Sequence, residues 1–407
     1  MSTLIPVENA QSAICAQLRP LAPETVSLLD AVGRVLAVDI PATLDQPPFT
    51  NAAMDGYAIR AEDVRNLPGP LPVDGVTAAG DGMVPPLRPG HARRIMTGAP
   101  LPDGADSVVP VELTTPGQGT VALHGAIQPG QHVRHRGEDL RAGALLLCAG
   151  HRIHALDVGA LAGQGIAQIS VTRRPRVGIL ATGDEVRPAG EALKPGQIYD
   201  ANTPAVAALI REFGGEPVAF PIVRDDADHL QAGLIQAGEA ELDLLLTSAG
   251  VSMGDYDLVK QMLGELGTVE FWKVAIKPGK PLAFGSLRRT GTETPLPLIG
   301  LPGNPVAAVA ACMVFVRPAI QTLLGEPVTP PFQITARLAE PLHNSGRRQF
   351  VRTRLTWDST TYTAHTAGLA GSANVAGLAH SDGFIVIPED VAELEVGDAV
   401  LVWAVRK

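Results

Sequence analysis

The amino-acid sequence predicts an α/β plus β protein. It is expected to have a central, doubly wound, mostly parallel α/β domain, an inserted β-rich module and a small carboxy-terminal β-barrel. Strand-like and helix-like apolar patterns alternate over 176–323, short apolar runs broken by Pro and Gly fill 46–145, and short strand-like runs return over the last eighty residues. A chain of 407 residues is also too long for one hydrophobic core, so several domains are expected.

Composition excludes several classes of function. The net charge of −10 argues against non-specific binding to nucleic acid or to an anionic membrane. Cys15, Cys148 and Cys312 lie far apart without metal-ligand spacing, which is typical of free thiols in a reducing compartment. The sequence begins with no basic segment followed by an apolar core, and no apolar run approaches membrane-spanning length. We therefore expect a soluble, cytoplasmic protein.

The first 175 residues are predicted to form two parts. Apolar residues at helical spacing predict helices over 6–18 and 155–163. We assign 1–45 together with 146–175 to an elongated helical and β domain. The segment between them, 46–145, is dense in Pro and Gly turns and is predicted to be the inserted β-rich module.

The α/β domain is predicted over 176–326. Its strands are expected over 177–181, 218–223, 242–247, 268–276, 281–287 and 295–300. Its helices are expected over 202–213, 226–239, 256–266 and 304–323. Because strands alternate with helices, the sheet should be parallel with helices on both faces. A Pro-rich linker then leads into the last domain, 327–407, predicted to be a small β-barrel or sandwich.

The distribution of lysine points to an anion site. Four of the six lysines, Lys260, Lys273, Lys277 and Lys280, lie within one short stretch, whereas arginines are spread along the chain. Lys277 and Lys280 share the stiff sequence KPGKP that ends at Pro281. Because an ammonium group is a compact point charge suited to an oxyanion, we expect a site for an anionic, phosphorylated ligand here.

Three further clusters follow strands of the same predicted sheet. They are Thr182–Glu185, Ser248–Asp257 and Leu301–Pro305. Each cluster alone has an ordinary explanation as a turn, a helix N-cap or a helix start with proline in its first turn. Ligands of doubly wound sheets, however, bind outside the carboxyl ends of the strands, where all of these clusters should meet. Their convergence therefore favours a functional site.

Several segments together carry a resemblance to a known family. They are Met54–Ala58 (MDGYA), Ile95–Pro100 (IMTGAP), Arg136–Asp139 (RGED), Ala181–Glu185 (ATGDE), Ile276–Pro281 (IKPGKP) and Gly300–Pro305 (GLPGNP). By residue pattern alone, the first three are β-turns. In this order, and over nearly the whole chain, the set resembles the molybdopterin molybdenumtransferase family, which includes the carboxy-terminal part of gephyrin.

The resemblance implies the last step of molybdenum cofactor synthesis. Adenylyl-molybdopterin and molybdate would bind, the dithiolene would take up the metal, and the phosphoanhydride would be hydrolysed with release of AMP. Mg²⁺ is the metal that it implies. It also implies an elongated homodimer whose cleft is shared between the α/β domain of one subunit and the partner subunit. The upstream adenylyltransferase and molybdoenzyme chaperones are the expected protein partners.

The resemblance also assigns roles to residues. Catalytic roles fall on Asp184, Glu185, Asp55, Thr97 and Asp139. Substrate or nucleotide binding falls on Gly250, Ser252, Asp255, Asp257, Asp225, Asp226, Lys273, Lys277, Lys280, Pro302 and Pro305. Molybdate binding falls on Lys280, Pro281, Arg347, Arg352 and Ser372. The magnesium ligands would be Asp184, Glu185 and Asp257.

The chain departs from the family pattern at three places. Ala249 precedes Gly250 where the family usually has two glycines, and Ala307 stands where a serine is common. Ala376 and Gly377 stand where a pair of serines is often found. The loss of the hydroxyl at Ala307 removes one possible ligand for molybdate.

Two other functions are compatible with parts of the pattern. One is adenylyl transfer to molybdopterin, the preceding step, which relatives of the α/β domain perform alone. The extra amino-terminal residues and the β-rich domain argue against it. The other is a scaffold that uses this fold to bind a protein partner, against which the carboxylates and lysines of the predicted cleft argue.

Overall fold

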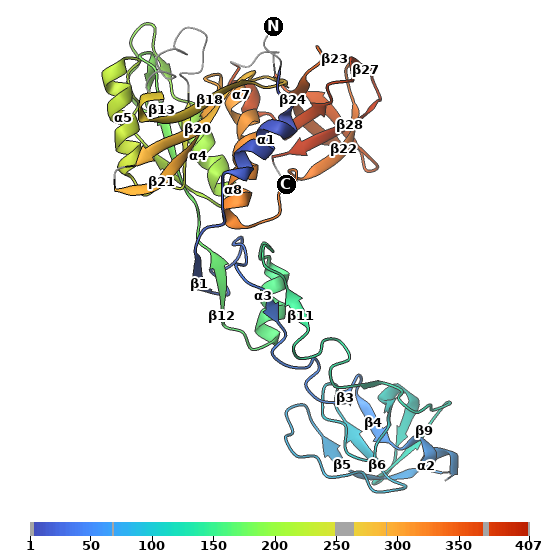
Figure 1. Cartoon of the computed structure of the whole chain (residues 1–407). Helices are drawn as coiled ribbons and strands as arrows, with labels where there is room; N and C mark the ends of the chain where they lie inside the picture. Colours follow the sequence, from blue (N-terminus) through green and yellow to red (C-terminus); the bar gives the residue numbers. More distant parts are fainter. Residues whose placement is uncertain (1–3, 67–68, 249–263, 290, 369–373, 406–407) are drawn as a thin grey trace. The chain divides into compact units, whose positions relative to one another are not determined.

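The computed structural model describes residues 4–66, 69–248, 264–289, 291–368 and 374–405 (Figure 1). The chain divides into two compact units. Unit 1 comprises 1–38, 149–154 and 168–407, and unit 2 comprises 39–148 and 155–167. The finer division of the chain into four domains stays a prediction.

Unit 1 contains the predicted doubly wound sheet. Its order is β16-β13-β17-β21-β20-β18, formed by Glu216–Ala219, Arg176–Ala181, Leu244–Ser248, Thr292–Leu301, Pro281–Arg289 and Gly267–Lys273. The first four strands in this order are parallel, as predicted. β20 and β18 run antiparallel to their neighbours, because three strands follow one another here with no crossover helix between them.

Helices cover both faces of this sheet. They are α4 (Asn202–Phe213), α5 (Ala227–Glu239), α7 (Pro305–Ala311), the π-helical η2 (Cys312–Val316) and α8 (Arg317–Leu324). Val177 and Ile179 of β13 lie in one hydrophobic core with α4, α7 and α8, whereas Leu180 lies in another with α5. In Figure 1, α5 accordingly lies on one side of the sheet and α4 on the other. This two-sided burial explains why the strands read as continuous apolar runs.

The segment Pro305–Leu324 is one nearly continuous helix. The expectation that no apolar run approaches membrane-spanning length was wrong for this segment, which is long and apolar enough to cross a membrane. However, 89% of its apolar window is buried inside the protein. Its side chains pack against the sheet, α4 and α1 (Val7–Ala16). It is therefore a core helix of unit 1.

The carboxy-terminal part of unit 1 is the predicted small barrel. Its strands are β22 (Gln333–Leu338), β24 (Arg348–Trp357), β25 (Tyr362–Thr366), β26 (Gly383–Ile387) and β28 (Ala399–Ala404). The barrel closes because β24 pairs with both β25 and β26. The short strand β19 (Ile276–Lys277) adds to β24 and so connects the barrel with the lysine-rich loop. Smaller elements of unit 1 are β1 (Pro23–Ser27), β12 (Gln168–Thr172), β14 (Val186–Arg187), β15 (Ile198–Tyr199), β23 (Leu342–His343), β27 (Glu393–Leu394) and α9 (Ala376–Ala379).

The regular elements of unit 2 are mostly short strands, as predicted for 46–145. Its main sheet has the order β7-β4-β6-β5-β9-β8, formed by Ser107–Pro110, Gly56–Ile59, Ala92–Ile95, Leu71–Thr77, Thr120–Leu123 and Thr114–Pro116. Shorter elements are β2 (Ile40–Pro41), β3 (Asn51–Ala52), η1 (Val111–Leu113), β10 (Val133–Arg134) and β11 (Leu145–Leu147). The helix α3 (Ala155–Gly163) lies where it was predicted, whereas α2 (Ala61–Asn66) is a short helix that the all-β prediction missed.

The packing of α1 generates a stability prediction. Ile14 is fully buried in the main core of unit 1, whereas Leu29 of the same unit is 80% exposed. Ile14→Ala should lower the free energy of unfolding of unit 1 by about 2–5 kcal/mol, and Leu29→Ala should change it little. Denaturant unfolding followed by tryptophan fluorescence measures this, because all three tryptophans belong to unit 1. Equal midpoints for the two variants would contradict the packing of α1.

Candidate active site

Three strands that precede predicted clusters end side by side at one edge of the unit 1 sheet. β13, β17 and β21 are parallel, and their last residues lie side by side in the register Ala181–Ser248–Leu301. Thr182 and Ser248 are buried there, and the backbone N–H of Thr182 donates to the Ser248 carbonyl oxygen at 3.2 Å. The structure thus brings the strand ends before Thr182–Glu185 and Leu301–Pro305 together with Ser248, the first residue of the third cluster. The rest of that cluster, 249–257, lies outside the described residues.

Asp184 and Glu185 project from the turn after β13. Gly183 has φ +147°, a backbone conformation that side chains disfavour, so glycine allows the sharp turn. Both carboxylates are exposed, and Arg224 Nε lies 3.5 Å from Asp184 Oδ1. An exposed ion pair of this length is weak, so Asp184 remains free to bind a cation.

The lysine loop packs directly on the loop after β21. Gly279 has φ +97°, and a Cβ atom added to it would lie 3.2 Å from Pro302 Cγ and 3.5 Å from Ala307 Cβ. Lys280 is exposed on this loop and Lys277 is half-buried, and Lys273, the last residue of β18, is exposed. The methyl group of Ala307 therefore lies against the lysine loop, at the position where the family often has serine. The loop that carries Lys277 and Lys280 therefore contacts the segment 302–307 through Gly279.

The barrel contributes one arginine beside this loop. Arg347 Nη1 donates to the Ile276 carbonyl oxygen at 3.4 Å, and β24 begins next to it by pairing with β19. This places Arg347 next to the predicted lysines, through contacts within unit 1.

Arg352 has different surroundings. It is only 6% exposed, and its Nη1 donates to the Asn374 carbonyl oxygen at 2.6 Å. A Cβ atom at Gly377 would lie 2.1 Å from the same Nη1. The glycine at 377 therefore has a packing reason, because a serine there would displace the guanidinium group. In this structure Arg352 supports the backbone of 374–377, and its assignment to molybdate stays a prediction.

Asp226 is a helix cap in this structure. Its Oδ1 accepts hydrogen bonds from the backbone N–H of His229 at 3.0 Å and from His229 Nδ1 at 2.7 Å. These two contacts lower the pKa of the Asp226 carboxyl. Asp226 thereby begins α5. Of the four aspartates predicted to bind substrate or nucleotide, Asp226 has a structural role that does not need a ligand.

Asp55 and Thr97 of unit 2 are in direct contact. Asp55 Oδ1 accepts hydrogen bonds from both the hydroxyl and the backbone N–H of Thr97, each at 2.7 Å. The Thr97 hydroxyl and its backbone N–H lower the pKa of the Asp55 carboxyl. Asp139 lies on another loop of unit 2, where its backbone N–H donates to the Gln46 carbonyl oxygen at 3.0 Å. Asp55 and Asp139 are exposed, so their carboxylates are accessible.

Some predicted site residues lie outside the described residues. They are Gly250, Ser252, Asp255, Asp257, Lys260 and Ser372. Within the described ranges, no group of three or more His, Cys, Asp or Glu side chains has the arrangement of a metal site. The predicted magnesium set of Asp184, Glu185 and Asp257 is therefore not tested.

Asn202 is a site residue that the sequence analysis missed. Its Nδ2 donates to Ser248 Oγ at 2.9 Å and to the Gly303 carbonyl oxygen at 2.6 Å. It therefore joins the end of β17 to the loop after β21. The only sequence signal was its place at the start of a predicted helix, next to two clusters that were already recognised.

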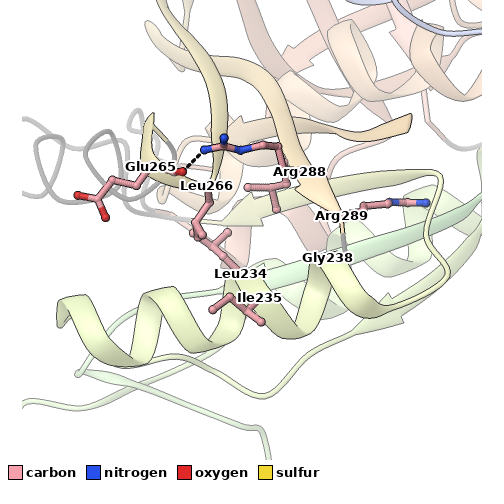
Figure 2. Close-up of a pocket in the computed structure, with 8 residues that line it drawn as sticks. Leu234, Ile235, Gly238, Glu265, Leu266, Arg288 and Arg289 are labelled. Carbon is pink, nitrogen blue, oxygen red and sulfur yellow. Dashed lines mark hydrogen bonds between the residues drawn. The ribbon is translucent and has the colours of Figure 1, made fainter. Parts of the chain in front are cut away.

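A cavity lies at the edge of the sheet opposite the candidate active site (Figure 2). Its volume is about 290 Å³, and Leu234, Leu266 and Leu287 line part of it. Arg288 and Arg289 lie beside it, and they donate to the backbone carbonyl oxygens of Glu265 and Leu242. Because Arg289 pairs with Thr292 at the start of β21, this cavity is distant along the strands from the 301–305 loop. It does not belong to the candidate active site.

Comparison with known proteins agrees with this fold. The sequence matches the MoeA N-terminal region (domain I and II) over 5–165, a probable molybdopterin binding domain over 178–322 and the MoeA C-terminal region (domain IV) over 335–405. The molybdopterin molybdenumtransferase 2 of Mycobacterium tuberculosis is 38% identical over 98% of both chains. The molybdopterin molybdenumtransferase of Nostoc sp. is 38% identical over 93% of this chain and 88% of its own.

The structural comparison gives the same result. The crystal structure of the molybdopterin biosynthesis MoeA protein from Pyrococcus horikoshii has a TM-score of 0.82 and 33% identity, with all of both chains covered. The fold and the relatives together define a transferase of molybdenum cofactor biosynthesis. The chain belongs to the molybdopterin molybdenumtransferase family.

The contact between Thr97 and Asp55 generates a pH-dependent prediction. Thr97→Val removes the hydroxyl donor, so the pKa of Asp55 should rise toward its ordinary value of about 3.9. A carboxyl with a lowered pKa stabilises the folded state above its unfolded pKa, and this stability is lost as pH falls through the folded pKa. The difference in Tm between wild type and Thr97→Val should therefore be present at neutral pH and shrink below about pH 4.

Calorimetry measures the Tm difference, and carbon NMR of the carboxyl group measures the pKa. Thr114→Val is the control, because the Thr114 hydroxyl donates to a backbone carbonyl oxygen of Val111, which does not titrate. Its effect on Tm should not depend on pH in the acid range. An unchanged pKa of Asp55 in Thr97→Val would show that the hydroxyl does not stabilise the carboxylate.

Proposed function

We propose that this enzyme inserts molybdate into the dithiolene of adenylyl-molybdopterin and releases AMP. The observation that carries the proposal is the contact of the lysine loop with the 301–305 loop, at the edge where β13, β17 and β21 end. Lys277 and Lys280 belong to the lysine loop, Lys273 pairs with Pro281 directly after it, and Arg347 contacts Ile276 directly before it. Such a group of cations suits a ligand with several negative charges, as a phosphoanhydride and molybdate are.

Each group has a proposed role. Lys277 and Lys280 neutralise the phosphate and the incoming molybdate, and Lys273 contributes positive charge from the end of β18. Arg347 offers a planar donor to the same oxyanions. Glu185 accepts a proton from the water that attacks the phosphoanhydride, the P–O bond breaks, and AMP leaves. Asp184 lies beside it and, like Glu185, offers oxygen ligands for a metal ion.

Magnesium fits this donor set. Mg²⁺ is bound in enzymes through one or two carboxylates together with water and substrate phosphate oxygens. Asp184 and Glu185 are two exposed carboxylates on one turn, so they would hold it at the sheet edge, with Asp257 as the third proposed ligand. When bound, the metal would neutralise charge on the phosphoanhydride.

One experiment separates this reaction from its alternatives. Purified enzyme is incubated with adenylyl-molybdopterin, with and without molybdate, and AMP is measured. We expect AMP release that depends on molybdate. Consumption of ATP with unmodified molybdopterin would instead indicate the preceding adenylyl transfer, and no release under either condition would favour a scaffold.

The lysine loop generates a first functional prediction. Lys280→Ala should weaken the apparent affinity for molybdate about tenfold or more, because a hydrogen bond to a charged group contributes about 1.5–3 kcal/mol. Its Tm should stay close to that of wild type, because Lys280 is exposed. Arg337→Ala, which removes an exposed charge from the barrel, is the matched control and should change neither quantity. Normal turnover of Lys280→Ala at limiting molybdate would refute the anion site.

We also propose that the enzyme works in the cytoplasm as a homodimer with shared sites. The predicted functional residues are divided between the units: Asp55, Thr97 and Asp139 belong to unit 2, and the lysines and Arg347 belong to unit 1. A twofold dimer would complete each site with unit 2 of the partner subunit. The upstream adenylyltransferase is the proposed donor of substrate, and molybdoenzyme chaperones are the proposed acceptors of the product.

Mixed dimers test the shared site. Asp55→Ala and Lys280→Ala chains should each be nearly inactive alone at limiting molybdate. A dimer of one Asp55→Ala chain and one Lys280→Ala chain should recover activity, because one of its two sites keeps both residues. As the control, Lys277→Ala mixed with Lys280→Ala should recover nothing, because both changes affect the same loop. A mixed dimer as inactive as its parents, or a fully active monomer, would exclude this arrangement.

A further inference from the structure

Asn202 joins two of the converging strand ends at the candidate site through two hydrogen bonds of its side-chain amide. Ser248, the last residue of β17, receives one bond through its Oγ, and Gly303, in the loop after β21, receives the other through its backbone oxygen. Asn202 itself is held at the start of α4, where the next backbone N–H, that of Thr203, donates to Asp200 Oδ1 at 3.0 Å. Asn202 therefore connects Ser248 and Gly303 to the start of α4.

The orientation of the Asn202 amide follows from its partners. The Gly303 oxygen is a carbonyl and can only accept a hydrogen bond, so the group that faces it must be the NH₂ of Asn202. The Oδ1 of Asn202 is then buried and accepts no hydrogen bond in the described part of the chain. Among the described residues, the contribution of the Asn202 side chain therefore comes from the two bonds that its NH₂ group donates, to Ser248 and to Gly303.

The Gly303 contact connects Asn202 with the lysine loop. Gly303 follows Pro302, whose ring lies against Gly279 between Lys277 and Lys280. A shift of the 301–305 loop would therefore move the surface on which the lysine loop rests. Asn202 contacts no lysine itself in the described structure, so its effect on an anion must pass through this loop.

We propose that Asn202 is a positioning residue for the anion site. It holds the 301–305 loop at Gly303, and that loop in turn holds Lys280 where it binds the anionic substrate. This inference rests on the proposed function, because it takes Lys280 to be a molybdate or phosphate ligand. It adds a residue that contributes to affinity for the anion without contact to it.

A double-mutant cycle tests the proposal with inorganic molybdate as the varied substrate in the AMP-release assay. Asn202→Leu keeps a similar volume and removes both bridging bonds. It should raise the KM for molybdate about tenfold, with a much smaller change in kcat, because the bridge affects binding of the anion. Its Tm should fall less than that of Ile14→Ala, because the change also removes a buried unpaired acceptor.

The decisive outcome is the combination with Lys280→Ala. If Asn202 acts through the lysine loop, Asn202→Leu should add little in the Lys280→Ala background, so the double variant should lose about 10–20-fold and not the hundredfold of independent effects. The same change combined with Arg337→Ala should show the full effect of Asn202→Leu. Should Asn202→Leu not fold, the smaller Asn202→Ser takes its place in the cycle, with the same expected direction.

The results separate this inference from the proposed function. If Lys280→Ala leaves the KM for molybdate unchanged, the proposed anion site is wrong. If Lys280→Ala raises the KM but Asn202→Leu does not, or if the two effects multiply fully, the positioning role is wrong and the anion site stands. If the effects of Asn202→Leu and Lys280→Ala on the KM for molybdate are not additive, both the anion site and the positioning role of Asn202 are supported.

Discussion

The burial of the helix Pro305–Leu324 is the constraint on which unit 1 depends. This helix packs against the sheet, α4 and α1, and it begins at the loop that forms the wall of the candidate site. Pro305 stands in its first turn. Nearly all of the buried side chains of the helix are apolar. The hydrophobic core of the domain therefore determines where the 301–305 loop lies, and through Pro302 it also determines where the lysine loop lies.

Much of this fold was predictable because its signals are local and strong. The helices α3 and α4 coincide with the predicted ranges, and β13, β17 and β21 were expected within a few residues. Long apolar runs identify strands that are buried on both faces, and alternation with helices makes them parallel. The direction of β20, which runs against both of its neighbours, was harder to predict. The direction of a strand depends on its partners in the sheet and not on its own sequence. The short helix α2 has too few residues for a periodic signal.

The candidate site was predictable in position and less so in detail. The topology of a doubly wound sheet requires loops after parallel strands to meet at one edge, so residues such as Asp184 and Lys280 could be grouped in advance. The contacts of a single side chain depend on packing that no local pattern encodes. Asn202 was missed for that reason, and the burial of Arg352 against Gly377 could not be seen in the sequence. Asp226 shows the converse case, because a carboxylate in a suggestive place caps a helix.

The antiparallel edge of the sheet has a practical consequence for this molecule. Because β20 runs against β21, the lysine loop lies at one end of β20 and the β20–β21 turn lies at the other end. Gly291 in that turn has open space where a side chain would be. Loop tips of this kind tolerate insertions. A short peptide tag placed there would allow the enzyme to be attached to a surface with its candidate active site facing away from the support.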